Sequence, residues 1–182
     1  ITYRYAVNLA EGAGLVYNPG ERVLSTTSLL WAVVLAPVAA LGWQVPAAAT
    51  LLGALSLALG GYCLWQIGRA ARQPWIGAAG LALYPLHPMV TGTLSSETPL
   101  YLALGLGALA LYIHRRFSLA ALLEALAAVA RPDGLLFAVV LGLDTAISWW
   151  RARRRGEASY VPWHAAVVFL LAWLPWVRWG GA

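Results

Sequence analysis

Three charged side chains stand beside long apolar stretches of this sequence, and their types could support proton transfer or anion binding. Glu97 follows two serines and precedes Thr98-Pro99, a typical helix start. Arg131 and Asp133 flank the proline of an Arg-Pro-Asp-Gly turn. A positioned carboxylate can move a proton, and a guanidinium can bind an anionic group. If the apolar stretches lie in lipid, each of these charges is costly and is a candidate functional residue.

The same residues also have purely structural interpretations. Glu97 can favour the macrodipole at the start of its helix, with Ser96 as the N-cap and Pro99 in the first turn. Arg131 and Asp133 can form a local ion pair that stabilises the turn between two helices. The sequence leaves both interpretations open.

Three further ionisable residues lie within apolar segments. Glu124 could be a buried site residue, or it could snorkel towards an interface or face a neighbouring helix, and Asp144 has the same alternatives. His87 lies between Pro85 and Pro88 without a His or Cys partner at metal-ligand spacing. This favours a packed or interfacial histidine over a metal ligand.

The elements that must position these residues are apolar and long. Of the 182 residues, 61% are hydrophobic and 10% are charged, which is typical of a membrane protein. In lipid the backbone must satisfy its own hydrogen bonds as helices or a closed barrel, and these runs lack the two-residue alternation of barrel strands. The sequence therefore predicts an all-α fold, a polytopic bundle of transmembrane helices.

Seven apolar segments follow a polar, turn-rich start. They are Thr26–Val45, Pro46–Gly68, Trp75–Thr93, Thr98–Ile113, Leu119–Ala130, Leu135–Trp150 and Pro162–Val177. A span needs about 20 apolar residues, so the fifth segment is too short alone. We predict an external loop at 1–25, an interfacial helix at 26–45 and a bundle of about six spans at 46–182, with the native protein extending beyond both ends.

Basic residues near the segment ends set the expected orientation. The basic packets are Arg69/Arg72, His114/Arg115/Arg116 and Arg151/Arg153/Arg154/Arg155. Because arginine-rich loops face the cytoplasm, the junctions that carry Glu97 and Asp133 are expected on the non-cytoplasmic face, together with Tyr17. The packets lie beside apolar runs and not along one face, which argues against nucleic acid as a partner.

The segment Thr26–Val45 conflicts with this orientation if it crosses the membrane, because loop 1–25 would then be cytoplasmic. Pro37 lies in the middle of the segment, and Trp31 and Trp43 bracket it. A helix flanked by tryptophans can lie along the membrane interface. We therefore expect an interfacial helix, which places loop 1–25 and the two charged junctions on one face.

Four stretches of the sequence carry a shared pattern. They are Tyr3–Val23 (YRYAVNLAEGAGLVYNPGERV), Thr27-Ser28-x-x-Trp31, Ser96-Glu97-Thr98-Pro99-Leu100-Tyr101 and Ala130-Arg131-Pro132-Asp133-Gly134-Leu135-Leu136. In type and order they resemble the N-terminal part of multi-pass GT-C glycosyltransferases, which use sugars linked to polyprenyl phosphate. The likeness is to bacterial arabinofuranosyltransferase-like and mannosyltransferase-like members.

The resemblance implies a multi-pass enzyme of the inner (cytoplasmic) membrane with its active face on the non-cytoplasmic side. It would move a sugar from a polyprenyl-phosphate carrier to a glycan, lipid or protein acceptor of the cell envelope. The general base of similar proteins is an aspartate in the first external loop. That residue is expected before Ile1, outside this sequence.

The resemblance also implies roles for charged residues that are present. Arg4 and Arg131 would hold the phosphate as its charge develops, with Tyr3 in the same site. Glu97, a candidate catalytic residue other than the general base, and Asp133 would orient the acceptor or a divalent metal ion. No carboxylate cluster of clear metal-binding spacing is visible, however. Arg4 could equally contact solvent or a lipid headgroup.

A second functional class remains open, a non-catalytic structural or accessory subunit of a membrane complex. The small residues of Leu104–Ala108 suit close contact between helices, as such packing requires. A transporter is disfavoured, because the sequence has no convincing internal repeat.

Overall fold

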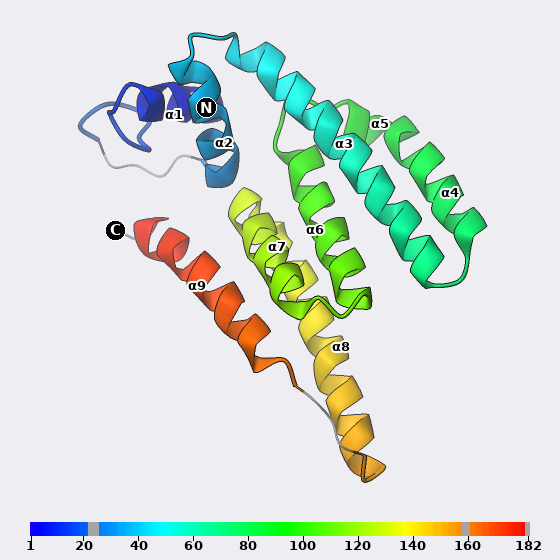
Figure 1. The fold of residues 1–182 in the computed structure, drawn as a ribbon. Helices are drawn as coiled ribbons and strands as arrows, with labels where there is room; N and C mark the ends of the chain where they lie inside the picture. Colours follow the sequence, from blue (N-terminus) through cyan, green and yellow to red (C-terminus); the bar gives the residue numbers. More distant parts are fainter. Residues whose placement is uncertain (22–25, 158–160, 181–182) are drawn as a thin grey trace.

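The computed structural model describes residues 1–21, 26–157 and 161–180, and the regular structure within these ranges is entirely helical (Figure 1). Two single turns of 3₁₀ helix, η1 (Tyr84–Leu86) and η2 (Pro132–Gly134), join longer elements. The α-helices are α1 (Thr2–Ala10), α2 (Leu29–Ala40), α3 (Val45–Ala70), α4 (Pro74–Leu83), α5 (Pro88–Thr91), α6 (Thr98–Ile113), α7 (Phe117–Ala130), α8 (Leu135–Arg154) and α9 (Trp163–Gly180).

Several helix boundaries follow proline signals in the sequence. The prolines Pro46 and Pro99 lie in the first turns of α3 and α6, where the missing N–H costs nothing. The helix α7 ends at Ala130 because Pro132 disfavours a helical conformation at Arg131, whose backbone is extended. Six of the seven predicted apolar segments each correspond to one main helix, with ends that differ by up to a few residues.

The segment Trp75–Thr93 differs from its prediction as one continuous span. It is divided into α4, η1 and α5. Pro85 and Pro88 remove two backbone donors, and the backbone of His87 before Pro88 is extended (φ −71°, ψ 118°). At 10 residues, α4 is roughly 15 Å long and cannot cross a bilayer alone.

Two helical stretches within the described ranges are long and apolar enough to cross a membrane. They are Val45–Ala70, which is α3, and Pro132–Arg154, which is η2 with α8. Large apolar side chains cover their outer faces, whereas the core helix of a soluble protein would bury them. They include Leu51, Leu55 and Leu59 of α3, and Leu136, Val140, Leu143 and Ile147 of α8. The two helices are consistent with a membrane protein, and the bundle of about six spans stays a prediction.

The helices pack in a connected series around α3, α6 and α7. The helix α3 contacts α4 and α6, α7 contacts α6 and α9, and α1 contacts α2. The close approaches occur at small residues. A Cβ on Gly68 would lie 2.4 Å from the Cα of Gly77, and one on Gly53 would overlap the carbonyl oxygen of Leu94. The segment Leu104–Ala108 also allows a close approach between helices, because Gly105 lies against the ring of Phe137.

The predicted interfacial segment forms the 12-residue α2, which contains Pro37. Trp31 is 1% exposed and packs in a core with Ala6, Leu35 and Ala49, whereas Trp43 is exposed. The indole of Trp31 therefore anchors α2 to α1 and α3 and does not face lipid headgroups. The orientation of this helix along a membrane stays a prediction.

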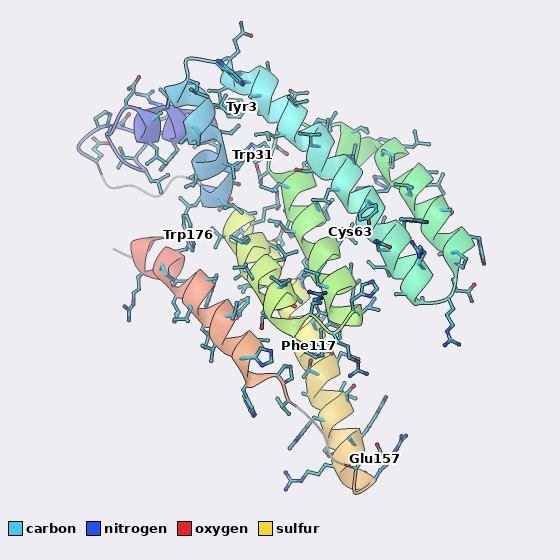
Figure 2. The ribbon with its side chains drawn as sticks, viewed as in Figure 1. Tyr3, Trp31, Cys63, Phe117, Glu157 and Trp176 are labelled. Atoms are coloured by element: carbon cyan, nitrogen blue, oxygen red, sulfur yellow. The ribbon has the colours of Figure 1, made fainter. Side chains whose placement is uncertain are left out.

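The two ends of the molecule differ in charge. In Figure 1 the C-terminal ends of α3, α6 and α8, which carry the basic packets, point towards the bottom of the view, and α1, α2 and the start of α6 lie towards the top. Figure 2 likewise shows Tyr3 and Trp31 near the upper end and Phe117 and Glu157 towards the lower end. This arrangement matches the predicted separation of the Glu97 junction from the basic packets.

Single introduced cysteines should therefore label from opposite sides of a sealed vesicle. We expect Ser95→Cys and Asn18→Cys to react with a membrane-impermeant thiol reagent from one side, and Arg69→Cys and Arg153→Cys from the other. The background variant Cys63→Ala removes the single native thiol, which is buried. Labelling of Ser95→Cys and Arg69→Cys from the same side would contradict the orientation.

Candidate functional site

Glu97, Arg131 and Asp133 meet at one end of the bundle, and we call them the Arg131 cluster. The guanidinium Nη1 of Arg131 donates to Oε1 of Glu97 at 3.1 Å. Its Nη2 and Nε donate to Oδ2 of Asp133 at 3.0 and 3.3 Å. The structure thus brings together three residues that the sequence predicted for one site, and Glu97 comes from a junction 34 positions away from Arg131.

The local backbone explains how the cluster forms. Glu97 is the N-cap of α6, Arg131 follows the last residue of α7, and Asp133 lies in η2. The turn folds back onto α7 because Gly134 has no side chain, since a Cβ there would lie 2.2 Å from the carbonyl carbon of Ala127. The close contact places Arg131 and Asp133 beside the start of α6.

The electrostatics of the cluster keep its cation charged. The hydrogen bonds that Arg131 donates to Asp133 raise the pKa of the guanidinium above its ordinary value, with a further contribution from Glu97, while partial burial acts in the opposite direction. The Glu97 side chain is 17% exposed, Arg131 36% and Asp133 55%. Because water screens such pairs, each contributes on the order of 0–1 kcal/mol to stability. The cluster contains two carboxylates and one guanidinium, so its net charge is negative.

A cavity of about 360 Å³ adjoins the cluster. Its polar wall is formed by His87, Thr93, Thr98, Tyr101, Arg131 and Asp133. The Arg131 guanidinium lies 5.8 Å from the centroid of the Tyr101 ring. His87, interpreted from the sequence as packed or interfacial, is exposed and lines this cavity. Most of the cavity wall is apolar, and Arg131 is paired with Asp133 there. A hydroxylated group could therefore enter directly, whereas an anionic group would have to displace Asp133 from Arg131.

Some of these cavity residues were not singled out from the sequence. Thr93 lies outside the matched motifs, whereas Tyr101 closes the stretch Ser96–Tyr101. The motif could have indicated Tyr101, since residues three or four positions apart share a face of a helix. Nothing in the sequence connects Thr93 with Arg131, because their proximity depends on the path of the chain between α5 and α6.

The two predicted site residues of α1 behave differently. The hydroxyl of Tyr3 donates to the carbonyl of Ser95, so α1 is attached to the loop that carries Glu97. The guanidinium of Arg4 instead lies 4.7 Å from the centroid of the Tyr17 ring and is exposed. The structure does not bring Arg4 into contact with the Arg131 cluster.

The capping interpretation of Glu97 can be compared with its contacts. Glu97 is at the N-cap of α6, but its side chain makes no capping hydrogen bond. The Oγ of Ser96 accepts from the N–H of Thr98 at 3.3 Å. The carboxylate of Glu97 is therefore directed to Arg131. The local pair of Arg131 with Asp133, the second structural interpretation, is also present.

The two acidic residues within apolar segments have different surroundings. Glu124 is 8% exposed, so its side chain does not snorkel to a surface. Asp144 is exposed and accepts a hydrogen bond of 2.7 Å from the hydroxyl of Tyr112. Neither residue touches the Arg131 cluster.

The residues of the cluster do not fit a divalent metal ion. Both Glu97 and Asp133 already bind the cation Arg131. In the part of the chain that the structure describes, no group of three His, Cys, Asp or Glu side chains is placed to hold a metal.

No known protein family, curated protein or solved structure matches the chain. The family resemblance therefore rests on the motifs of the sequence alone. Function has to be inferred from the residues around Arg131 and from the apolar surface of the helices.

Proposed function

We propose that this chain is part of a membrane glycosyltransferase that moves a sugar from a polyprenyl-phosphate carrier to an acceptor on the non-cytoplasmic face. The observation that carries the proposal is the contact of Glu97 with Arg131, whose side chain lines the cavity beside the cluster. These residues belong to two separate motifs that resemble the same family. Their contact supports a shared site.

The reaction needs a cation beside the leaving group. The bond between the sugar and the phosphate oxygen breaks, and the phosphate leaves with an added negative charge. The acceptor hydroxyl oxygen forms the new bond to the sugar and gives its proton to a base. Arg131 would stabilise the leaving phosphate through charged hydrogen bonds. The family resemblance implies that this base is an aspartate of the first external loop.

The exposures within the cluster suggest how phosphate could reach Arg131. Asp133 is the more exposed of the two carboxylates and Glu97 the less exposed. A phosphate oxygen would replace Asp133 on one edge of the guanidinium, while Glu97 keeps the other edge in place. Glu97 is in this view a positioning residue for Arg131.

The surroundings of the site support a lipid-linked donor. The outer faces of α3 and α8 are apolar, as a helix in a bilayer requires. The cluster lies at the opposite end of α6 from the basic packet His114–Arg116, which by the positive-inside rule supports a position on the non-cytoplasmic side. The carrier chain would then lie in lipid beside the helices with its phosphate near Arg131.

An accessory subunit remains the second candidate, and one observation favours it. The helix α8 exposes a long apolar face that another membrane protein could cover. In that case the Arg131 cluster would act as a structural ion-pair network that fixes the turn between α7 and α8.

A transfer assay separates the two candidates. The product of the complete native gene is purified into vesicles with labelled sugars on polyprenyl phosphate and with envelope extracts as acceptor. We expect label to move to the acceptor, and added polyprenyl phosphate without sugar to inhibit the transfer. Absence of transfer from pentose and hexose donors, with recovery only when a partner membrane protein is added, would favour the accessory subunit.

A further inference from the structure

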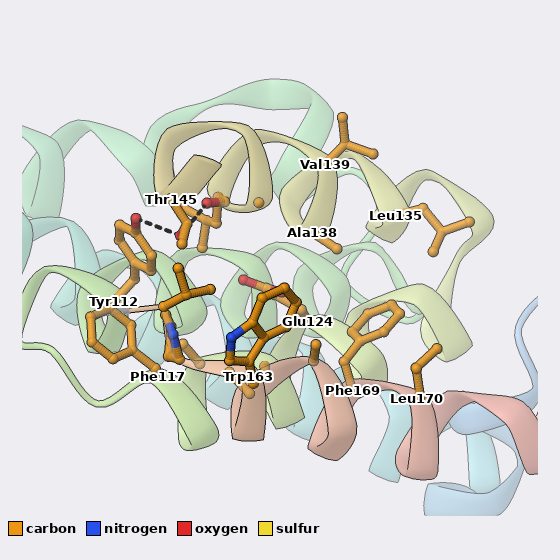
Figure 3. A pocket seen from close by; sticks show the side chains of 18 residues that line it. Tyr112, Phe117, Glu124, Leu135, Ala138, Val139, Thr145, Trp163, Phe169 and Leu170 are labelled. Atoms are coloured by element: carbon orange, nitrogen blue, oxygen red, sulfur yellow. Dashed lines mark hydrogen bonds between the residues drawn. The ribbon is translucent and has the colours of Figure 1, made fainter. Parts of the chain in front are cut away.

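A second cavity lies between α7, α8 and α9, away from the Arg131 cluster. Its volume is about 490 Å³, which is in the range of small-molecule sites. Figure 3 shows its side chains, most of them apolar. They include Phe117, Leu135, Val139, Trp163 and Phe169.

One acidic side chain projects into this apolar cavity. Glu124 lies on α7, is 8% exposed and lines the cavity, and Figure 3 shows its carboxylate between α8 and α9. No residue that the structure describes donates a hydrogen bond or an ion pair to it. A carboxylate buried in this way needs a proton or a donor to offset the loss of water. Within the described ranges that donor is not present, so the carboxyl group is either protonated or paired with a donor from outside them.

The nearby hydroxyls are engaged elsewhere. Tyr112 donates to Asp144 at 2.7 Å, and Thr145 donates to the carbonyl of Leu141 at 2.9 Å. The two hydroxyl oxygens also lie 2.9 Å from each other, as the dashed lines in Figure 3 mark. Each hydroxyl has one proton, so neither has one left for Glu124.

We propose that this cavity binds a single-chain aliphatic primary amine, with the ammonium on Glu124 and the alkyl chain among the apolar side chains of α7, α8 and α9. The choice of an amine follows from charge complementarity. None of the residues that line the cavity is basic, so the negative charge of Glu124 has no positive partner there. The ammonium supplies the donors that Glu124 lacks. Glu124 is seven residues before Arg131, roughly 10 Å along the helix axis, so this is a separate site.

Other amphiphiles fit the cavity less well. A fatty acid would place a second carboxylate beside Glu124, and the like charges would repel. An aminophospholipid would bring a phosphate near the same carboxylate and has two chains for a cavity of about 490 Å³. A long-chain alcohol offers one donor without a charge, and a hydrogen bond between neutral groups is weaker than one with an ion.

The proposal is tested by titrating the full chain in nanodiscs with dodecylamine, dodecanol and dodecanoate, with empty nanodiscs subtracted. We expect the amine to bind about tenfold more tightly than the alcohol, the fold-change of one charged hydrogen bond over a neutral one. Glu124→Gln should remove the preference. The matched control Asp144→Asn should keep it, because Asp144 lies outside the cavity lining and already has a donor.

A cavity-filling variant and a competing lipid provide two further measurements. Ala138→Phe fills the cavity from α8 and should weaken the binding of amine and alcohol alike. Added phosphatidylethanolamine should leave amine binding unchanged. Equal affinities for amine and alcohol in the wild type, an amine preference that survives in Glu124→Gln, or displacement of the amine by phosphatidylethanolamine would each overturn the proposal. If Glu124→Gln fails to fold, the wild-type comparison and Ala138→Phe decide it. Sugar transfer does not enter these readouts.

Discussion

Replacing Glu97 by Gln should lower sugar transfer about 100-fold or more and leave the fold intact. Glu97 holds one edge of the Arg131 guanidinium at 3.1 Å. The amide keeps the shape but loses the charge, so that edge of Arg131 is held less firmly and the guanidinium is no longer positioned for the leaving phosphate. A displacement of about 1 Å at a reacting group is enough for a loss of this size.

The measurement compares kcat and KM with thermal unfolding in the same detergent. We expect kcat to fall more than KM rises, because Arg131 acts most strongly as the phosphate charge develops. The unfolding temperature should change little, since a solvent-screened pair contributes on the order of 0–1 kcal/mol. Asp144→Asn, an acid-to-amide change outside the cluster, is the control and should transfer normally. Normal transfer in Glu97→Gln would assign the ion pair a structural role.

Gly134→Ala should destabilise the protein and abolish the Arg131 site together. The added Cβ would lie 2.2 Å from the carbonyl carbon of Ala127 and 2.4 Å from the backbone nitrogen of Ala128. Both are backbone atoms of α7, which cannot rotate aside as a flexible side chain does. The turn η2 must move away, and Arg131 then leaves Glu97. Overpacking of this kind costs about 1–3 kcal/mol, and transfer should fall with it.

Gly142→Ala provides a matched control of opposite sign. Gly142 lies in α8, eight residues beyond Gly134, with no atom within 4 Å of the added Cβ. Alanine is the better helix former there by about 0.5–1 kcal/mol, so this variant should unfold at the same or a higher temperature. Thermal unfolding and transfer are measured on both variants. Equal effects of the two substitutions would show that the contact with Ala127 does not determine the turn.

The helices were predictable where composition and proline placement agree. The bounds of α6 coincide with the predicted segment Thr98–Ile113, because Pro99 marks its start and an arginine pair follows its end. The break at His87 was missed, although Pro85 and Pro88 were visible. The sequence stays apolar across both prolines. The length of this apolar run therefore favoured the prediction of one continuous span over a break in the backbone at the prolines.

The sequence predicted which site residues lie at the same end of the molecule, but not which of them are in contact. The alternation of basic and acidic junctions predicts that Glu97 and Arg131 lie at one end of the helices. Their ion pair, however, depends on how α6 packs against α7. Arg4 was predicted for the same face, but its guanidinium lies on the Tyr17 ring, a side-chain conformation that no sequence pattern determines. The burial of Glu124 likewise depends on the rotation of α7 beneath α9.

The close contact between Gly53 and Leu94 sets the depth of the candidate site. Gly53 lies eight residues after Val45, the first residue of α3, which corresponds to about 12 Å along the axis. The loop that leads to Glu97 is therefore sunk below the end of the longest helix. A sugar on a lipid phosphate would then react at the depth in the membrane where its lipid carrier already holds it. The acceptor, and not the donor, would then have to travel to meet its partner.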